Sequence, residues 1–398
     1  MNRRTIVYAA DRSYRETLEA AIKSLIYNNH HIKIYVINTD IPQEWFNNIN
    51  RYLRLVDSYI IDKKIDIHTF DNYSIPGAYL SYMAYGRLLI PDIINEDKVL
   101  YLDCDTIING NINQLFDIDL NNHIIGAVRD CVIDGFNSGV MLINNRLLKQ
   151  RPEIVKSLVN AGMDSQNPQA DQSALNTVFG KNYLSLDDKY NYMVGSESDL
   201  FYQPEIAGDY FIRLANCTDP LIIHYTSANK PWLLTSSGRM RDLWWQYSNL
   251  EWNDLITNEK LPDIHSSSQG KLFIFTQGQD IQNIKQLAMN LSDFDFYIGA
   301  WTEMGEKLME LITISNIHLY PRISGPKLKE LSRNQLVYLD IAYFKDQKAN
   351  KLAEEYKKPI LSFNSTKTES NYSNYHSFPD KNITEMANLI RQYVKKEN

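Results

Sequence analysis

The feature that most constrains this chain is a repeated alternation between short apolar runs and amphipathic segments. Thr5–Ala10 is a largely apolar run typical of a buried strand, and Ser13–Asn29 has apolar residues at helical spacing. Ile32–Asp40 predicts a second strand, and Pro42–Leu53 predicts a second helix. Strands and helices that alternate in this way are typical of an α/β fold with a largely parallel sheet.

The alternation continues along the chain. Lys64–Phe70 predicts a third strand and Ala78–Ile94 a helix, and after the polar stretch Leu261–Lys271 a fresh alternation begins. Because 398 residues exceed what one hydrophobic core usually serves, we expect two domains. Their expected bounds are residues 1–262 and 271–398, and the second is expected to be a smaller α/β domain with a Rossmann-like fold.

Composition narrows the functional classes. The formal net charge of −7 argues against a general nucleic-acid binder, which needs a basic footprint. The 3 cysteines are odd in number and widely spaced, which argues against a disulfide framework and favours a reducing compartment. The first residues lack the apolar stretch of a signal peptide, and no window reaches the length of a membrane span. We therefore expect a cytoplasmic protein that binds no nucleic acid and has no membrane span.

Two acids follow the apolar run Lys98–Leu102 in an Asp-x-Asp pattern. Because side chains alternate along a strand, Asp103 and Asp105 are expected to point the same way and Cys104 the other. Two carboxylates so close stay ionised together when a cation lies between them. With water and phosphate oxygens they suit Mg²⁺ or Mn²⁺. The alternative is a solvated acid pair at a strand-to-loop junction, which is common.

Three further stretches carry candidate ligand-binding residues. In LIIHYTSANKPW, His224 could supply an imidazole nitrogen to the same metal, which favours Mn²⁺ over Mg²⁺, and Lys230 could place a charge on a phosphate. In GFNSGVMLIN, Ser138 precedes a glycine that would let the backbone approach a ligand closely. In ADQSALN, Asp171 and Gln172 begin a predicted helix. The alternatives are a histidine bonded at a strand end, an exposed lysine, an ordinary turn and a helix cap.

With these stretches assembled, the sequence resembles the family 8 glycosyltransferases, the group that contains bacterial lipooligosaccharide galactosyltransferases and glycogenin. AADRSY, YLDCD, FNSGVMLIN, ADQSALN and HYTSANKPW carry the resemblance, which covers Thr5 to Trp252. It implies a GT-A (Rossmann-like) catalytic domain, a UDP-hexose donor, Mn²⁺ with Mg²⁺ as a substitute, and retention at the anomeric carbon. The two-part chain is similar to transferases of Gram-positive bacteria that extend glycans on serine-rich repeat adhesins, which implies partner glycosyltransferases.

The resemblance implies which residues bind the nucleotide-sugar. They are Ala9, Asp11, Ser13, Tyr14, Arg87, Asp103, Cys104, Asp105, Asn137, Ser138, Asp171, Gln172, His224, Ser227 and Lys230. The implied metal ligands among them are Asp103, Asp105 and His224. Asp11 is implied as an acceptor for the N–H of the uracil base. The chain departs from the family where Ser13, Ser138 and Ser227 replace a frequent Asn, Ala and Gly.

The residues implied in catalysis are Asp171, Gln172 and Asp130. An oxocarbenium-like centre forms on the sugar as UDP leaves, and Gln172, expected nearest to it, is an amide and therefore a poor nucleophile. We expect front-face attack by the acceptor hydroxyl, with Asp171 orienting the donor and Asp130 facing the sugar or acceptor. In the alternative, Asp130 or Asp171 forms a short-lived covalent adduct.

The predicted activity is transfer of a hexose to a sugar already attached to a serine-rich repeat glycoprotein. Galactose is the favoured hexose, and glucose is next. The alternatives are a lectin-like or scaffold protein with an inactive transferase domain, a transferase acting on lipooligosaccharide or cell-wall glycan, and a nucleotidyltransferase or pyrophosphatase.

The second domain is expected to bind the acceptor or a partner; the alternatives are a nucleotide-binding half and a stabilising appendage. Four of its aromatic residues suit sugar stacking, although aromatics at strand ends are more often core. They are Tyr297, Trp301, Tyr320 and Tyr343.

Overall fold

The chain folds into two compact units, each discontinuous in sequence. The computed structural model describes residues 3–73, 81–164, 170–200, 203–257, 260–262, 264 and 268–397. The first unit gathers Met1–Val194, Glu205–Ala228 and Leu243–Pro262. The second gathers Gly195–Pro204, Asn229–Asp242 and Asp263–Asn398. The domain bounds expected above, and the roles of the two parts, stay predictions.

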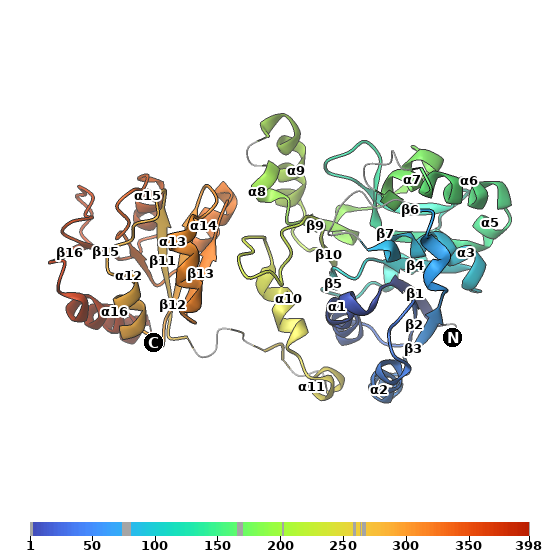
Figure 1. Cartoon of the computed structure of the whole chain (residues 1–398), viewed down its shortest axis with the longest axis horizontal. Coiled ribbons are helices and arrows are strands. Elements are labelled where there is room, and N and C mark those ends of the chain that lie inside the picture. Colours follow the sequence, from blue (N-terminus) through green and yellow to red (C-terminus); the bar gives the residue numbers. More distant parts are fainter. Residues whose placement is uncertain are drawn as a thin grey trace. The chain divides into compact units, whose positions relative to one another are not determined.

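The first unit is built on a 7-stranded sheet in the order β3-β2-β1-β4-β7-β6-β8 (Figure 1). Its strands are β1 (Arg4–Ala9), β2 (Ile32–Asn38), β3 (Tyr59–Lys64), β4 (Lys98–Leu102), β6 (Ile125–Arg129), β7 (Phe136–Asn144) and β8 (Leu184–Ser185). The strands from β3 to β4 are parallel, β7 runs antiparallel between β4 and β6, and β8 is parallel to β6. The α/β class predicted from the sequence is confirmed.

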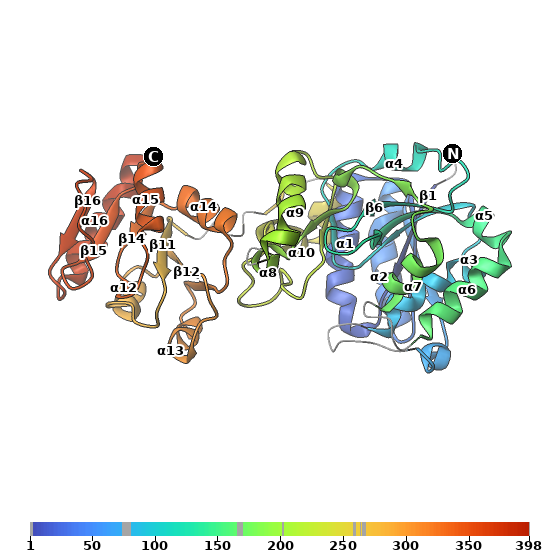
Figure 2. The same ribbon diagram turned by 90° about the horizontal axis from the view of Figure 1, so that it is seen from above.

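Helices cover both faces of this sheet (Figures 1 and 2). The helices before the polar stretch are α1 (Arg15–Asn28), α2 (Gln43–Leu53), α3 (Ile90–Ile93), α4 (Asn113–Asp117), α5 (Asn145–Lys149), α6 (Pro152–Gly162), α7 (Ala170–Phe179), α8 (Glu197–Leu200), α9 (Pro204–Asn216), α10 (Arg241–Ser248) and α11 (Trp252–Ile256). On β1, Ile6 and Tyr8 belong to a core cluster that includes residues of α1 and α2, whereas Val7 and Ala9 belong to another that includes residues of α6 and α7. Because both faces are buried, the strand is one apolar run in the sequence. No helix in the described parts of the chain is long and apolar enough to cross a membrane.

A smaller sheet positions the acid pair. Its 3 strands are β5 (Thr106–Ile108), β10 (Ile222–Tyr225) and β9 (Tyr192–Val194), in that order across the sheet. β10 pairs antiparallel with β5, with His224 opposite Thr106, and parallel with β9. Asp103 and Asp105 lie between β4 and β5, where the chain passes from the large sheet to the small one. This change of sheet brings the acids to the strand that carries His224.

The second unit is an all-parallel 6-stranded sheet in the order β13-β12-β11-β14-β15-β16. Its strands are β11 (Lys271–Thr276), β12 (Asp295–Ala300), β13 (Ile317–Tyr320), β14 (Val337–Leu339), β15 (Ile360–Phe363) and β16 (Tyr375–Phe378). The helices that follow β11 are α12 (Ile284–Asn290), α13 (Glu306–Met309), α14 (Gly325–Asn334), α15 (Lys348–Glu355) and α16 (Ile383–Glu397), and α8 also belongs to this unit. Counted from β11, the strand order is that of a doubly wound Rossmann fold, as predicted.

One local prediction was wrong, and a second was confirmed over the described part of its stretch. The third strand is Tyr59–Lys64, and the predicted position contains a 3-10 turn that begins where Asp66 accepts a hydrogen bond from the His68 amide at 2.8 Å. The helix predicted over Ala78–Ile94 is described from Ser81 onward, as a 3-10 helix followed by the single turn α3. The 3-10 helices are Arg12–Tyr14, Arg54–Val56, Ile67–Phe70, Tyr82–Leu89, Asp188–Tyr190 and Glu310–Thr313.

Candidate metal and donor site

The acid pair and His224 converge in the first unit. Asp103, Asp105 and His224 each offer one ligand atom, and these atoms lie within 4.8 Å of one another. His224 Nε2 lies 3.3 Å from Asp105 Oδ1 and 3.7 Å from Asp103 Oδ2. Both acids belong to a turn rather than a strand, yet they face the same imidazole. Cys104 Sγ instead lies 3.3 Å from the carbonyl oxygen of Ala9.

The imidazole of His224 is oriented by Asn191, which contacts the ring nitrogen on the side away from the acid pair. Its Nδ1 lies 3.0 Å from Asn191 Oδ1, and Asn191 Nδ2 donates to Asn137 Oδ1 at 2.9 Å. Because an amide oxygen only accepts, Nδ1 is the nitrogen that donates to Asn191, and Nε2 is the ring nitrogen that faces the carboxylates. Metal-binding histidines are typically held in this way. Asn191 was not predicted, since nothing in the sequence around it distinguishes it from its polar neighbours.

The space between the ligand atoms depends on Gly139. A Cβ atom added there would lie 2.0 Å from His224 Cε1 and 2.7 Å from Asp103 Oδ2. The Gly139 carbonyl also accepts a hydrogen bond from the Asp103 amide at 2.8 Å. Two carboxylates and an imidazole nitrogen form a donor set that suits Mn²⁺. The residues present therefore fit a divalent cation.

Arg87 connects the metal group to the acid predicted beneath the sugar. Its Nη2 donates to Asp103 Oδ1 at 2.6 Å, and its Nε lies 3.0 Å from Asp171 Oδ2. Its Nη1 donates to the Ser138 carbonyl at 2.7 Å. Although burial alone would lower the pKa of Arg87, the carboxylates of Asp103 and Asp171 raise it above the usual value. Burial raises the pKa of Asp171 to about 6, in opposition to the nearby guanidinium.

Gln172 and Asp130 extend this network. Gln172 Oε1 accepts hydrogen bonds from the Ser138 amide at 3.0 Å and from Asn137 Nδ2 at 3.2 Å. Gln172 Nε2 donates to Asp130 Oδ2 at 3.2 Å. Asp130 Oδ1 accepts from two backbone amides of the following turn, at 2.7 and 3.1 Å. Both oxygens of Asp130 are thus hydrogen-bonded, and the Gln172 amide is held at both ends.

The residues predicted at the nucleobase lie just after β1. Asp11 Oδ1 accepts from the amides of Ser13 and Tyr14 at 2.9 and 3.3 Å, and Oδ2 accepts from the Ser81 hydroxyl. Burial, reinforced by the charge on Asp105, raises the pKa of Tyr14 to about 12. The carboxylate of Asp11 already caps a turn, and its contact with a base stays a prediction.

Two residues predicted to bind the nucleotide-sugar, Ser227 and Lys230, follow β10. Ser227 is half-buried in the first unit, whereas Lys230 belongs to the second. The HYTSANKPW motif is therefore divided between the two units. Contact of Lys230 with the same ligand stays a prediction.

Asn191→Ala is expected to weaken Mn²⁺ binding by roughly 10–100-fold, because the imidazole would lose the acceptor that fixes its orientation. Titration calorimetry with Mn²⁺ measures the change. Asn253→Ala, at an exposed position of α11, is the matched control and should leave the affinity unaltered. Equal Mn²⁺ affinity in Asn191→Ala and the wild type would show that Asn191 does not position a metal ligand.

Comparison with known proteins gives a consistent result over the whole chain. Residues 5–236 match the family described as Glycosyl transferase family 8, and residues 272–398 match the GftB/GlyA-F C-terminal domain. Glycosyltransferase GlyE of Streptococcus pneumoniae serotype 4 is 33% identical over 405 residues, which cover 99% of each chain. Glycosyltransferase GlyB of the same organism is 32% identical over 99% of this chain and 100% of its own length. Glycosyltransferase GlyD is 35% identical over 91% of this chain, a match that spans 46% of GlyD.

Solved structures agree in fold. The crystal structure of GlyE matches with a TM-score of 0.56 and 32% identity, over 98% of this chain and 100% of that one. The galactosyltransferase LgtC, solved with donor and acceptor sugar analogues, matches with a TM-score of 0.52 over 65% of this chain and 98% of its own. At 23% identity, LgtC shows the fold alone. The GT-A fold predicted for the first part of the chain is confirmed.

Proposed function

Because this chain belongs to glycosyl transferase family 8, we propose that it transfers a hexose from a UDP-sugar to a glycan acceptor, with Mn²⁺ and retention at the anomeric carbon. The observation that carries the proposal is the convergence of Asp103, Asp105 and His224 within 4.8 Å. Arg87 connects that group to Asp171. The intact ligand set argues against a lectin-like or scaffold protein with a decayed domain.

Asp103, Asp105 and His224 would hold the cation. When bound, Mn²⁺ supplies a Lewis-acid charge that stabilises the diphosphate as it leaves. The imidazole ligand favours Mn²⁺, and two carboxylates leave Mg²⁺ as a substitute. Lys230 is proposed to add a positive charge to the same diphosphate.

The contacts around the sugar position favour front-face attack. Gln172 is a poor nucleophile and is held at both ends, and both oxygens of Asp130 accept hydrogen bonds. Asp171 is ion-paired with Arg87, so we assign it to orienting the donor rather than to forming an adduct. The acceptor hydroxyl would bond to the anomeric carbon as the bond to the phosphate oxygen breaks, and that oxygen would take the hydroxyl proton.

The finer assignments rest on the family resemblance of the sequence and on its composition. We propose galactose as the donor sugar, with glucose next, and a sugar already attached to a serine-rich repeat glycoprotein as the acceptor. The second part would bind the acceptor or a partner glycosyltransferase, and the protein would act in the cytoplasm. A glycan of lipooligosaccharide or of the cell wall is the alternative acceptor.

Turnover of UDP-galactose, UDP-glucose and UDP-N-acetylglucosamine with MnCl₂ tests the function. We expect release of UDP from one of these donors, loss of that activity with EDTA, and recovery with added Mn²⁺. Release of UMP would instead indicate a nucleotidyltransferase or pyrophosphatase. Activity that survives EDTA would contradict the role of the metal.

Lys230→Ala is expected to weaken UDP binding and to lower kcat by roughly 10–100-fold, since a charge-assisted hydrogen bond contributes about 1.5–3 kcal/mol. Steady-state kinetics and calorimetry with UDP measure the two effects. Lys329→Ala, at an exposed position of α14, should leave both unchanged. Kinetics of Lys230→Ala equal to those of the control would remove Lys230 from the donor site.

A further inference from the structure

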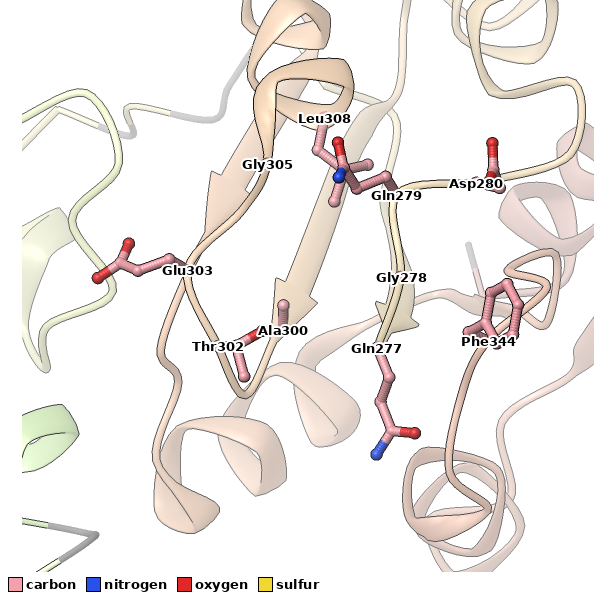
Figure 3. Close-up of a pocket in the computed structure, with 10 residues that line it drawn as sticks. All are labelled: Gln277, Gly278, Gln279, Asp280, Ala300, Thr302, Glu303, Gly305, Leu308 and Phe344. Carbon is pink, nitrogen blue, oxygen red and sulfur yellow. The ribbon is translucent and has the colours of Figure 1, made fainter.

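The second unit contains a cavity of about 510 Å³ at the carboxyl ends of β11 and β12 (Figure 3). It is lined by residues of the loops 277–280 and 300–305, and by Leu308 and Phe344. In a doubly wound sheet, ligands bind at this edge. Its volume falls within the range of about 300–1,000 Å³ that small-molecule sites occupy. The donor site described above uses none of these residues.

The loop after β11 is not arranged as a phosphate-binding turn. It is tied to the loop after β14, because the Gln277 amide donates to the Phe344 carbonyl at 2.7 Å and the Tyr343 amide donates to the Asp280 carbonyl at 3.1 Å. These hydrogen bonds join the two loops at the position between β11 and β14 where a dinucleotide binds in a Rossmann fold. The loop has one glycine, Gly278, rather than a glycine-rich sequence. A nucleotide-binding half is therefore disfavoured.

The charges at the cavity also disfavour an anion. Within the described chain, no lysine or arginine is among the residues that line it. Asp280 is ion-paired with Lys307, and Glu303 lies 3.5 Å from Arg322 and points away from the other labelled side chains (Figure 3). A phosphate would meet carboxylates and amides there, and the two cations beside the cavity, Lys307 and Arg322, are already paired with carboxylates.

Phe344 is an exposed aromatic residue of the cavity lining, and its backbone is fixed by a hydrogen bond. Phe344 is 64% exposed, although its carbonyl is fixed by the Gln277 amide at 2.7 Å. A Cβ added at Gly278 would lie 3.0 Å from Phe344 Cβ and Cδ2, so the glycine lets the ring pack on the loop. An exposed ring of this kind offers an apolar face on which a sugar ring can stack.

Polar groups near this ring can bind hydroxyls. Gln279 Oε1 accepts from the Lys307 amide at 3.2 Å, and a Cβ at Gly305 would lie 2.4 Å from Gln279 Cδ. The glycine therefore allows the amide to lie against the loop with its NH₂ group still able to donate. Gln277 and Thr302 add another amide and a hydroxyl to the lining. Neutral donors and acceptors of this kind match sugar hydroxyls.

The four aromatic residues considered above for sugar stacking differ from Phe344 and from one another in burial and contacts. Tyr297 and Tyr320 are buried and stack on each other with ring centroids 5.5 Å apart, so they belong to the core. Trp301 is half-buried, and its Nε1 donates to Asp346 Oδ2 at 2.8 Å. Tyr343 is exposed, as considered, and precedes Phe344, which was not predicted.

We propose that this cavity binds a neutral saccharide of one or two units, at a site separate from the donor site. Phe344 would stack on the sugar ring, and the amides of Gln277 and Gln279 would bind its hydroxyls. That this saccharide is part of the glycan acceptor rests on the proposed function, whereas the binding itself does not.

Saturation-transfer NMR on the full chain tests the site with lactose, N-acetyllactosamine and chitobiose as neutral probes and with UDP as an anionic one. Inorganic phosphate, which has no carbon-bound protons, is followed by ³¹P line broadening. At least one saccharide should bind, roughly tenfold more weakly to Phe344→Ala than to the wild type. Met289→Ala removes an equally exposed side chain from α12 outside the cavity and should bind like the wild type. Asp103→Ala should also keep saccharide binding.

Two results would overturn the site: no saccharide whose binding depends on Phe344, or binding of phosphate or UDP that Phe344→Ala weakens. The proposed function is tested separately, by measuring the release of UDP. Saccharide binding at the cavity without turnover of any UDP-sugar would refute the proposed function and leave the cavity assignment standing.

Discussion

Asp103→Ala is expected to lower kcat/KM for the UDP-sugar by on the order of 10³, because the leaving diphosphate loses its main source of positive charge. Asp103 contributes a ligand oxygen 3.7 Å from His224 Nε2 and accepts a hydrogen bond from Arg87 at 2.6 Å. Its loss removes one metal ligand and one anchor of the arginine. Release of UDP in the presence of MnCl₂ is the measurement.

Asp105→Ala removes the second carboxylate of the same group and should cause a loss of similar size. Asp92→Ala, at an exposed position of α3, controls for the general loss of a negative charge and should keep full activity. Thermal unfolding of each variant separates loss of chemistry from loss of fold. Near-normal activity of either site variant with Mn²⁺ present would show that the acid pair does not hold a catalytic metal.

Arg87→Met is expected to lower the free energy of unfolding of the first unit by about 3–5 kcal/mol, because it leaves a buried carboxylate without its partner. The Arg87 side chain is 4% exposed and lies 3.0 Å from Asp171, whose side chain is 7% exposed. In a domain of this size the change corresponds to a lower melting temperature by roughly 6–20 °C, which calorimetry resolves.

The double variant Arg87→Met/Asp171→Leu tests the cause of this loss. Since it also removes the uncompensated charge, it should be more stable than Arg87→Met alone. Lys329→Ala, on the exposed surface of the other unit, gives the baseline. A change below about 1 kcal/mol in Arg87→Met, the range of an exposed ion pair, would contradict the view that Arg87 neutralises the buried carboxylate of Asp171.

Local patterns predicted most of the regular structure. Thr5–Ala10 and Ile32–Asp40 were predicted as strands, and β1 and β2 occupy Arg4–Ala9 and Ile32–Asn38. Both are buried on two faces, so their apolar runs are visible in the sequence. Strands β5 and β9 of the small sheet could not be predicted in this way, because they are 3 residues each and exist through pairing with the distant β10.

The candidate site was predictable where residue type alone carries the chemistry. The carboxylates and the imidazole were identified because few other side chains bind a divalent cation. The contacts that support these side chains were not predictable. Tyr101 donates a hydrogen bond to Asp103 at 2.9 Å, and Asn191 lies 3.0 Å from His224, which is 33 residues away in the sequence. A hydroxyl or an amide takes such a role only through a fold that brings it there.

The division of the chain into units was also beyond local patterns. Gly195–Pro204 and Asn229–Asp242 lie within the stretch that resembles the catalytic domain, yet they belong to the second compact unit. Within that unit, Arg322 pairs with Asp199 and Arg239 lies 3.4 Å from Glu197. Charged surface residues pair by tertiary proximity, and neither periodicity nor spacing reports it.

The central claim is that Asp103, Asp105 and His224 hold a divalent cation against the diphosphate of a UDP-sugar. Anomalous scattering from crystals of the protein soaked with Mn²⁺ and UDP tests it most directly. The account predicts one manganese peak bonded to both carboxylates, to His224 Nε2 and to diphosphate oxygens. A manganese peak elsewhere, or UDP bound with these three side chains unligated, would contradict it.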